Sequence, residues 1–197
     1  MLNNNDLLNL IDIEKVLHQL LLQIRTSTSS DAGTIYLKNG DCLKFCVFQN
    51  DSLSSIQIKQ MEEDNKFLRL PLIDKRYIAV KSFLSLSTIR INDIQQKNDL
   101  FLDGIKDFDM KYGFTTHSMV TIPLVDIFSK NPIGILQIIN KVKDKEFIPY
   151  SDMDLEFIKI ASSFISFNIS KAIEYKESLE RIDNEINSVL NDEIVKK

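Results

Sequence analysis

The chain has 197 residues, of which 44% are hydrophobic and 26% are charged, and its formal net charge is −4. This length supports one sizeable hydrophobic core, so we expect one domain with helical extensions. The acidic balance, with no basic block along the chain, excludes the electrostatic footprint of a nucleic-acid-binding protein.

The sequence also argues against a secreted or membrane-bound protein. It has no apolar run near the roughly 20 residues that a membrane-spanning helix needs, and its first residues lack the charged and apolar regions of a signal peptide. We therefore expect a cytoplasmic location and no membrane partner. Cys42 and Cys46 lie in one predicted strand, where roughly 13 Å separates them. A disulfide does not span that distance, so both are expected to be reduced thiols.

In chain order, the first predicted helix runs from Ile13 to Ile24, because apolar residues recur there at helical spacing after Asp12 as N-cap. Residues 1–12 are then an N-terminal extension. A strand over Ala32–Leu37 turns at Asn39-Gly40 and pairs with Cys42–Gln49. Residues 50–72 show only a weak pattern, and we expect an irregular crossover there, in which a helical turn is one option.

Four short elements are predicted next: a strand over Arg69–Ile73, a helix over Tyr77–Leu86, an edge strand over Thr88–Ile91 and a helix over Leu100–Tyr112 that stops at Gly113. A hairpin follows, with strands Ser118–Val125 and Ile133–Asn140. Both faces of its first strand are apolar, which is typical of a central strand. Pro123 is expected near a strand end, at a bulge or at a non-pairing position.

A long C-terminal helix is predicted from Ser151 or Asp152 onward, because the chain contains no Pro or Gly after Pro149. Residues at a 3-4 alternation predict a coiled-coil seam, in which only Asn168 is polar: Ile158, Ala161, Ile165, Asn168, Ala172, Tyr175, Leu179, Ile182, Ile186 and Val189. We expect the first half to pack on its own domain as well, and residues 176–197 to form a dimer stalk. The alternative is a helix folded back along its own domain.

The stretch Tyr112–Lys141 carries the motif Tyr-Gly-Phe-Thr-Thr-His-Ser-Met-Val-Thr-Ile-Pro-Leu and, after a polar break, Ile-Gly-Ile-Leu-Gln-Ile-Ile-Asn-Lys. This pattern resembles the signature of GAF domains, and the resemblance extends over residues 13–175. It implies an α+β fold: a six-stranded antiparallel sheet with the N- and C-terminal helices on one face and a ligand pocket on the other. The segment Arg90-Ile91-Asn92-Asp93 resembles the family's Ile-Pro-Asp segment without its proline.

The resemblance also implies a structural ion pair. In phosphodiesterase-type GAF domains an Asn-Lys pair is followed by an aromatic residue and an acid, and the Lys pairs with the acid. Asn140-Lys141 is intact in this chain, Tyr150 resembles the aromatic residue and Asp154 resembles the acid. An alternative register uses Phe147 and Ser151.

For cyclic-nucleotide-binding members, the resemblance places the ligand near eight positions: Gly33, Phe48, Ala79, Asn92, Asp93, Thr116, Ser118 and Gln137. Phe48 would stack on a base, Thr116 and Ser118 would bond a phosphate or ribose, and Gln137 would read a polar edge. Ordinary alternatives exist: Phe48 as a core residue and Asn92-Asp93 as a plain turn. The chain lacks a Gly-rich phosphate loop.

No catalytic constellation, metal site or cofactor is predicted. His18 and His117 are far apart and have no clustered Cys or acidic partners, although His117 is expected at the rim of the pocket. The resemblance implies a non-catalytic regulatory sensor of a bacterial-type signalling protein. It would bind a small molecule, with a cyclic nucleotide as one candidate, and signal through a homodimeric C-terminal helix. The downstream effector would be a cyclic-di-nucleotide phosphodiesterase, a cyclase or a histidine kinase.

Two other functions remain open. The first is a structural dimerisation module without a ligand. The second is a small GAF-type enzyme such as a free methionine sulfoxide reductase, which requires several cysteines around its pocket. Cys42 and Cys46 on the second strand do not resemble that arrangement.

Overall fold

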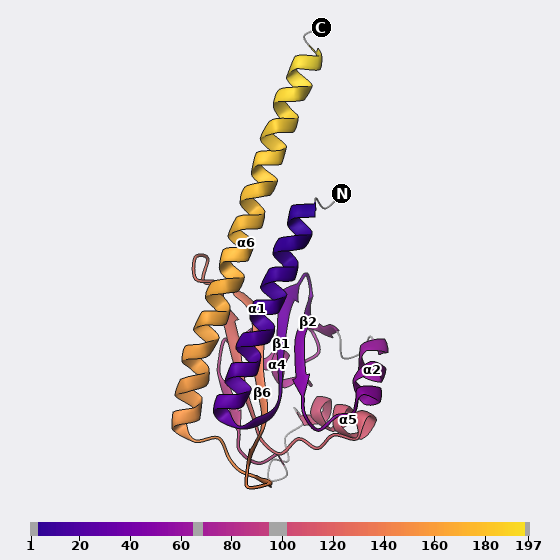
Figure 1. The fold of residues 1–197 in the computed structure, drawn as a ribbon, viewed down its shortest axis with the longest axis vertical. Helices are drawn as coiled ribbons and strands as arrows, with labels where there is room; N and C mark the ends of the chain where they lie inside the picture. Colours follow the sequence, from indigo (N-terminus) through magenta and orange to yellow (C-terminus); the bar gives the residue numbers. More distant parts are fainter. Residues whose placement is uncertain (1–3, 65–68, 95–101, 196–197) are drawn as a thin grey trace.

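The computed structural model describes residues 4–64, 69–94 and 102–195 and contains both helices and antiparallel strands (Figure 1). In chain order they are α1 (Asn4–Thr28), β1 (Ser30–Asn39), β2 (Cys42–Asn50), α2 (Ser55–Glu63), β3 (Arg69–Pro71), α4 (Ile78–Ser85), β4 (Ile89–Ile91), α5 (Asp103–Tyr112), β5 (Met119–Val125), β6 (Pro132–Lys143), β7 (Glu146–Phe147) and α6 (Asp152–Val195).

The sheet has the predicted antiparallel architecture. Its strands lie in the order β3-β2-β1-β6-β5-β4, and the short β7 pairs with the end of β6. β5 has a partner on each side, β4 and β6, which confirms the prediction of a central strand. Pro123 lies past Met119–Thr121, the three residues that β4 pairs, so it occupies a position on β5 where a missing N–H group is tolerated.

The N- and C-terminal helices lie side by side on one face of the sheet (Figure 1). They share one hydrophobic core with the sheet residues beneath them, and four of its members are fully buried helix residues: Leu17, Leu21, Ile158 and Ile165. The opposite face holds separate clusters that include residues of α2, α4 and α5. This is the layer arrangement that the family resemblance implied.

Helix α2 contradicts the predicted irregular crossover. It begins with a capping box, in which the Ser54 side chain accepts a hydrogen bond from Gln57 N and the Gln57 side chain accepts one from Ser54 N. The Ser-x-x-Gln spacing is a known helix start signal, so the sequence contained the information. Gln57 Nε2 also donates to Tyr112 O at 2.6 Å, which joins α2 to the end of α5.

Helix α1 begins at Asn4, so the prediction of a helix start capped by Asp12 was wrong. Residues 4–28 contain no Gly or Pro, so no helix-breaking residue separates the part of α1 before Asp12 from the part after it.

Helix α5 ends as predicted, because Gly113 adopts φ +64° as the left-handed C-cap. The N-terminal part of the predicted Leu100–Tyr112 helix lies outside the described residues.

Helix α6 projects beyond the rest of the molecule over its second half (Figure 1). The first half of α6 packs on its own domain, as predicted, because Ile158 and Ile165 of the predicted seam are 0% exposed and belong to the domain core. These two seam positions are therefore not available to a partner helix. A straight helix drifts by about 20° per heptad relative to a strict heptad repeat. Residues that follow a heptad repeat therefore shift gradually to another side of this straight helix over its 44 residues.

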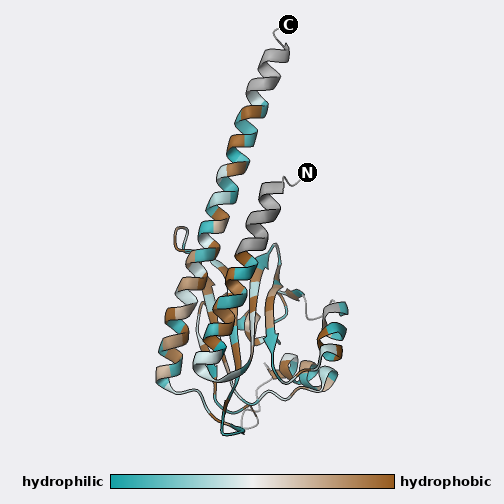
Figure 2. Ribbon diagram, in the orientation of Figure 1, coloured by the Kyte–Doolittle hydropathy of each residue, from teal (hydrophilic) through white to brown (hydrophobic). Residues whose placement is uncertain are grey.

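A second apolar stripe on α6 is exposed, and it shares Tyr175, Ile182 and Ile186 with the predicted seam. Hydrophobic residues recur along the ribbon of α6 in Figure 2. The members of the stripe recur every three or four residues over the first part of the helix and continue into the projecting part: Met153, Phe157, Ile160, Phe164, Phe167, Tyr175, Ile182 and Ile186. We call these eight residues the α6 stripe. Two buried serines hold the opposite side of α6 to the sheet, since Ser166 Oγ accepts from Val125 N at 3.3 Å and Ser170 Oγ accepts from Ile127 N at 3.1 Å.

Candidate functional site

A cavity of about 70 Å³ lies on the sheet face opposite α1 and α6. Its floor follows from strand register. Thr34 on β1 pairs with Phe48 on β2 and with Gln137 on β6, and side chains that are directly opposite on neighbouring strands share one face. The floor therefore continues along β1 at every second residue, which adds Ala32 and Tyr36.

The walls and roof come from helices and loops that are distant in sequence. Lining residues of α4 and of the residue before it are Tyr77, Ile78 and Ala79; those of α5 are Gly104, Ile105 and Phe108; those of the following loop are Phe114 and Thr116. Gly104 permits a close approach, because a Cβ atom there would lie 2.6 Å from the Tyr77 ring. The described lining is therefore mostly apolar and aromatic.

Four of the predicted ligand residues meet in this cavity: Phe48, Ala79, Thr116 and Gln137. The polar groups of Thr116 and Gln137 already donate hydrogen bonds within the protein. Thr116 Oγ1 donates to Asp109 Oδ1 at 2.8 Å, whereas Gln137 Nε2 donates to Thr121 Oγ1 at 3.2 Å. Burial raises the pKa of Asp109, and the hydrogen bonds from Thr116 oppose that rise.

The other four predicted ligand residues lie elsewhere. A Cβ atom on Gly33 would contact Leu21 and Arg25, so this glycine faces α1. Ser118 Oγ donates to Ile148 O at 3.5 Å and accepts from Lys141 N at 3.3 Å, so it joins the start of β5 to β6 and to the residue after β7. Asn92 and Asp93 follow β4 and do not line the cavity.

Several lining residues were missed in the sequence, including Thr34, Tyr36 and Phe45. Strand alternation was the available signal, because Gly33 and Thr34 must point to opposite faces. The register of β1 against β2 shifts between Ile35 and Tyr36, and this irregularity is not encoded in a recognisable motif. Residues of α4 and α5 could not be placed without the tertiary fold.

The Asn-Lys motif holds the segment before β5. Asn140 is fully buried with φ +57°. Its Oδ1 accepts from His117 N at 2.7 Å and its Nδ2 donates to Thr115 O at 2.7 Å. The cavity residue Thr116 lies between Thr115 and His117, so Asn140 fixes one wall of the cavity.

Lys141 reaches the start of α6, where Nζ lies 2.5 Å from Asp154 Oδ2. Asp154 also accepts from Ser151 N at 2.7 Å. Burial raises the pKa of Asp154, but the hydrogen bonds from Lys141 and Ser151 outweigh it and hold that pKa below its ordinary value. Tyr150 is 1% exposed and its hydroxyl lies 2.9 Å from Ser30 Oγ. Phe147, the aromatic residue of the alternative register, stacks on His117 instead.

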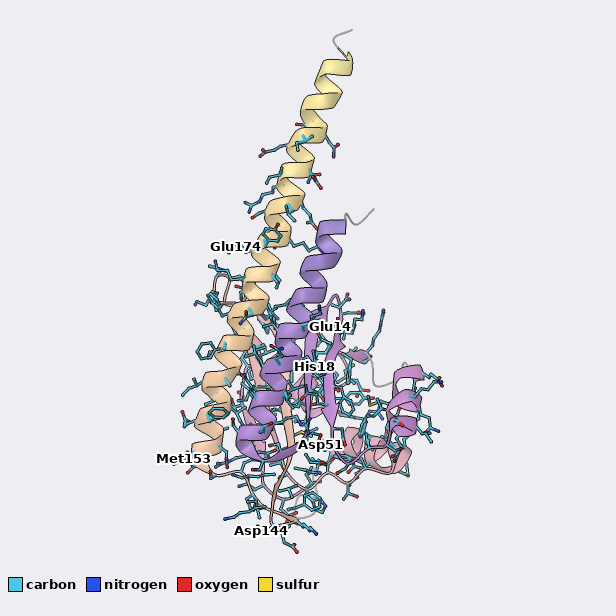
Figure 3. All side chains as sticks on the ribbon, in the orientation of Figure 1. Glu14, His18, Asp51, Asp144, Met153 and Glu174 are labelled. Carbon is cyan, nitrogen blue, oxygen red and sulfur yellow. The ribbon has the colours of Figure 1, made fainter. Side chains whose placement is uncertain are left out.

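A second groove, of about 560 Å³, runs between α1 and β2. Figure 3 shows Glu14 and His18 on the side of α1 next to β2. Gln49 Nε2 donates to His18 O at 2.7 Å, and Gln49 Oε1 accepts from Arg25 Nη1 at 3.2 Å. Arg25 is only 4% exposed and pairs with Asp51 at 2.5 Å. These side chains bond to one another and fasten α1 to the edge of the sheet.

Neither thiol lines the 70 Å³ cavity. Burial raises the pKa of Cys46 to about 11, which keeps this residue protonated at neutral pH, and a thiol is a much weaker nucleophile than a thiolate.

Within residues 4–64, 69–94 and 102–195, no group of three His, Cys, Asp or Glu side chains is placed to hold a metal ion. Over the same residues no helix combines the length and apolarity needed to cross a bilayer.

The chain belongs to the GAF family: the model of the GAF domain matches residues 12–169. A curated relative, the cGMP-specific 3',5'-cyclic phosphodiesterase of Drosophila mojavensis, is 22% identical over 182 residues, which cover 89% of this chain. The match spans only 15% of that relative's own length. The shared part is therefore a domain-sized piece of a much larger protein.

Solved structures show the same fold. A GAF domain/HD domain protein from Geobacter sulfurreducens has a TM-score of 0.63 at 13% identity, with 83% of this chain and 95% of that chain covered. Residues 122 to 287 of a methyl-accepting chemotaxis protein give 0.62 at 19% identity, with 84% and 93% covered. A free methionine-R-sulfoxide reductase from Thermoplasma acidophilum gives 0.56 at 11% identity, with 83% and 96% covered. The fold thus occurs both in signalling proteins and in an enzyme.

Proposed function

We propose that this chain is a non-catalytic sensor domain of a signalling protein, which binds a small molecule in the 70 Å³ cavity and changes the position of α6. The observation that carries the proposal is the course of β6. Gln137 and Ile139 of this strand line the cavity, and Lys141 of the same strand binds Asp154 at the start of α6. One strand therefore contacts both the candidate ligand site and the candidate output helix.

Asn140 provides a second connection between cavity and helix. Its side chain holds Thr115 and His117 on either side of the cavity residue Thr116, and its neighbour Lys141 holds α6. A ligand that moves Thr116 would pull on Asn140 and thereby on the Lys141–Asp154 pair. Such a ligand shifts α6 only to the extent that it binds one of two conformations more tightly.

The output would pass through a homodimer in which α6 stripes of two copies meet. All eight residues of the α6 stripe have large hydrophobic side chains that are at least 40% exposed, and Met153 has the highest exposure, 83%. Contiguous exposed apolar surface of this kind marks interaction sites. The effector that receives the signal from α6 would be a cyclic-di-nucleotide phosphodiesterase, a cyclase or a histidine kinase.

Thermal shift measurements with a panel of uncharged and charged small molecules, cAMP and cGMP included, test the proposal. A ligand that binds only the folded state raises the melting temperature. The matched control is Ala79→Leu, whose isobutyl group fills the cavity. At least one compound should stabilise the native chain and not this variant, and it should change amide hydrogen exchange at the start of α6. If no compound separates the two proteins, the chain is not a sensor of this kind.

A structural dimerisation module is the second candidate, and the size of the cavity is the observation that favours it. Ligand pockets commonly measure about 300–1,000 Å³, whereas this cavity measures about 70 Å³. For such a module, Ala79→Leu would leave dimerisation and the behaviour of α6 unchanged, and no compound would bind in the cavity.

A further inference from the structure

We infer that the cavity takes an uncharged aromatic molecule of about one ring that carries a neutral hydrogen-bonding group such as an amide. The inference rests on the proposed sensor function and names its ligand class. It is carried by three independent features of the cavity: the aromatic walls, the polar groups of Thr34, Tyr36 and Asn50 on its floor, and the carboxyl group of Asp109 next to Thr116.

The walls suit a flat apolar molecule. Phe45 and Phe48 lie 5.6 Å apart between ring centroids on the floor, and Phe108 and Phe114 meet edge to face at 6.2 Å on the opposite wall. All four line the cavity. Aromatic side chains prefer offset-stacked or edge-to-face partners, so a ring placed between these pairs gains contacts of both kinds.

The floor presents polar groups to the cavity. Thr34 is 3% exposed and Tyr36 is 8% exposed, and both line the cavity. Asn50 Nδ2 is buried without a partner, and Asn50 also lines the cavity. Buried polar groups without partners are costly, so a ligand that bonds to them gains affinity.

These groups match a neutral amide or similar group. Hydroxyls donate and accept, and the Asn50 amide nitrogen donates, so the carbonyl oxygen of a ligand would meet donors on β1 and β2. Gln137 Nε2 is already bound to Met119 Sδ at 3.3 Å and to Thr121 Oγ1, which leaves its Oε1 to accept from a ligand N–H group.

An anion is disfavoured at the side where the family resemblance would place a phosphate. The Thr116 hydroxyl donates to Asp109 at 2.8 Å and the Thr116 N–H donates to the same carboxyl group at 2.7 Å. Thr116 therefore has no proton left for a phosphate, and an ionised Asp109 beside it would repel one. Ser118, the other expected phosphate residue, bonds to Ile148 O and Lys141 N outside the cavity.

Size acts in the same direction. A cavity of about 150 Å³ is known to bind benzene, and this one measures about 70 Å³. A single ring enters if the partly exposed Phe45, Phe48 or Phe108 moves outward. A cyclic nucleotide joins a purine, a ribose and a phosphate, and it requires a far larger rearrangement.

Benzamide and benzoate provide a matched test on the full chain, because they share one shape and differ in charge. We expect benzamide to raise the melting temperature by about 3 °C or more at ten times its Kd, and benzoate and cGMP to leave it unchanged. Thr34→Val and Tyr36→Phe remove one hydroxyl each from the cavity floor. Each should leave the ligand-free protein at least as stable and weaken benzamide binding by about 3- to 10-fold.

Ile35→Val is the control on the same strand, since Ile35 is buried in the core on the other face. It should lower the melting temperature without changing the affinity for benzamide. If benzoate or cGMP binds in the cavity and benzamide does not, the uncharged ligand class is overturned and the sensor function stands. If benzamide stabilises Ala79→Leu as much as the native chain, it binds elsewhere, and the inference is overturned as well.

Discussion

The Lys141–Asp154 ion pair connects the sheet to α6, and its energetic weight follows from its surroundings. The two side chains are 17% and 12% exposed, which places the pair between a surface pair, worth about 0–1 kcal/mol, and a fully buried pair, whose disruption costs about 3–5 kcal/mol. Asp154→Asn retains an acceptor for the Ser151 N–H group but leaves Lys141 without its counter-charge. We expect a loss of about 2 kcal/mol at pH 7, or roughly 4–8 °C in melting temperature.

The pH dependence distinguishes an ion pair from simple packing. Because the pKa of Asp154 is lowered in the folded protein, its contribution is complete above the unfolded pKa of about 4. It is lost as the pH falls through the folded pKa. The variant with Asn does not titrate at this position. The difference in free energy of unfolding should therefore be constant from pH 7 to pH 5 and shrink below about pH 4.

Urea denaturation followed by circular dichroism, at one fixed protein concentration, measures this difference. Lys141→Met and the double variant complete a cycle, and a coupling energy of about 1 kcal/mol or more is expected for two residues in direct contact. A variant as stable as the native chain at pH 7 would refute the reasoning, as would a difference that persists unchanged down to pH 3.

Three further outcomes are expected. Gly134→Ala places a Cβ atom 2.3 Å from the Tyr36 carbonyl oxygen, so it should cost about 2 kcal/mol or more in urea denaturation; an unchanged midpoint contradicts the close approach. Cys46, with a pKa raised to about 11, should react with iodoacetamide at pH 8 much more slowly than the same residue in urea, as mass spectrometry measures. The double variant Phe164→Glu with Ile182→Glu should be a folded monomer in light scattering. The control Glu177→Lys, at an exposed position outside the α6 stripe, should remain a dimer. If the double variant is still a dimer, the interface lies elsewhere.

Local sequence signals determined much of this protein. The alternation of apolar residues and the turn at Asn39-Gly40 predicted the first hairpin, and the two apolar faces of Met119–Val125 predicted a central strand. These features depend on neighbours within a few residues of each other, so they can be recognised in one sequence. The capping box of α2 belongs to the same class and was present in the sequence, although the crossover prediction overlooked it.

The cavity and the outward side of α6 required the tertiary structure. Gly33 and Thr34 are adjacent in sequence, and only the pairing of Thr34 with Phe48 and Gln137 shows which of them faces the cavity. Likewise, Ile158 fits a regular seam in the sequence but is fully buried against its own sheet. Strand register and helix rotation depend on contacts between distant segments. The pattern along the chain therefore determined which elements form, and the packing between them decided which side chains meet a ligand and which remain for a partner.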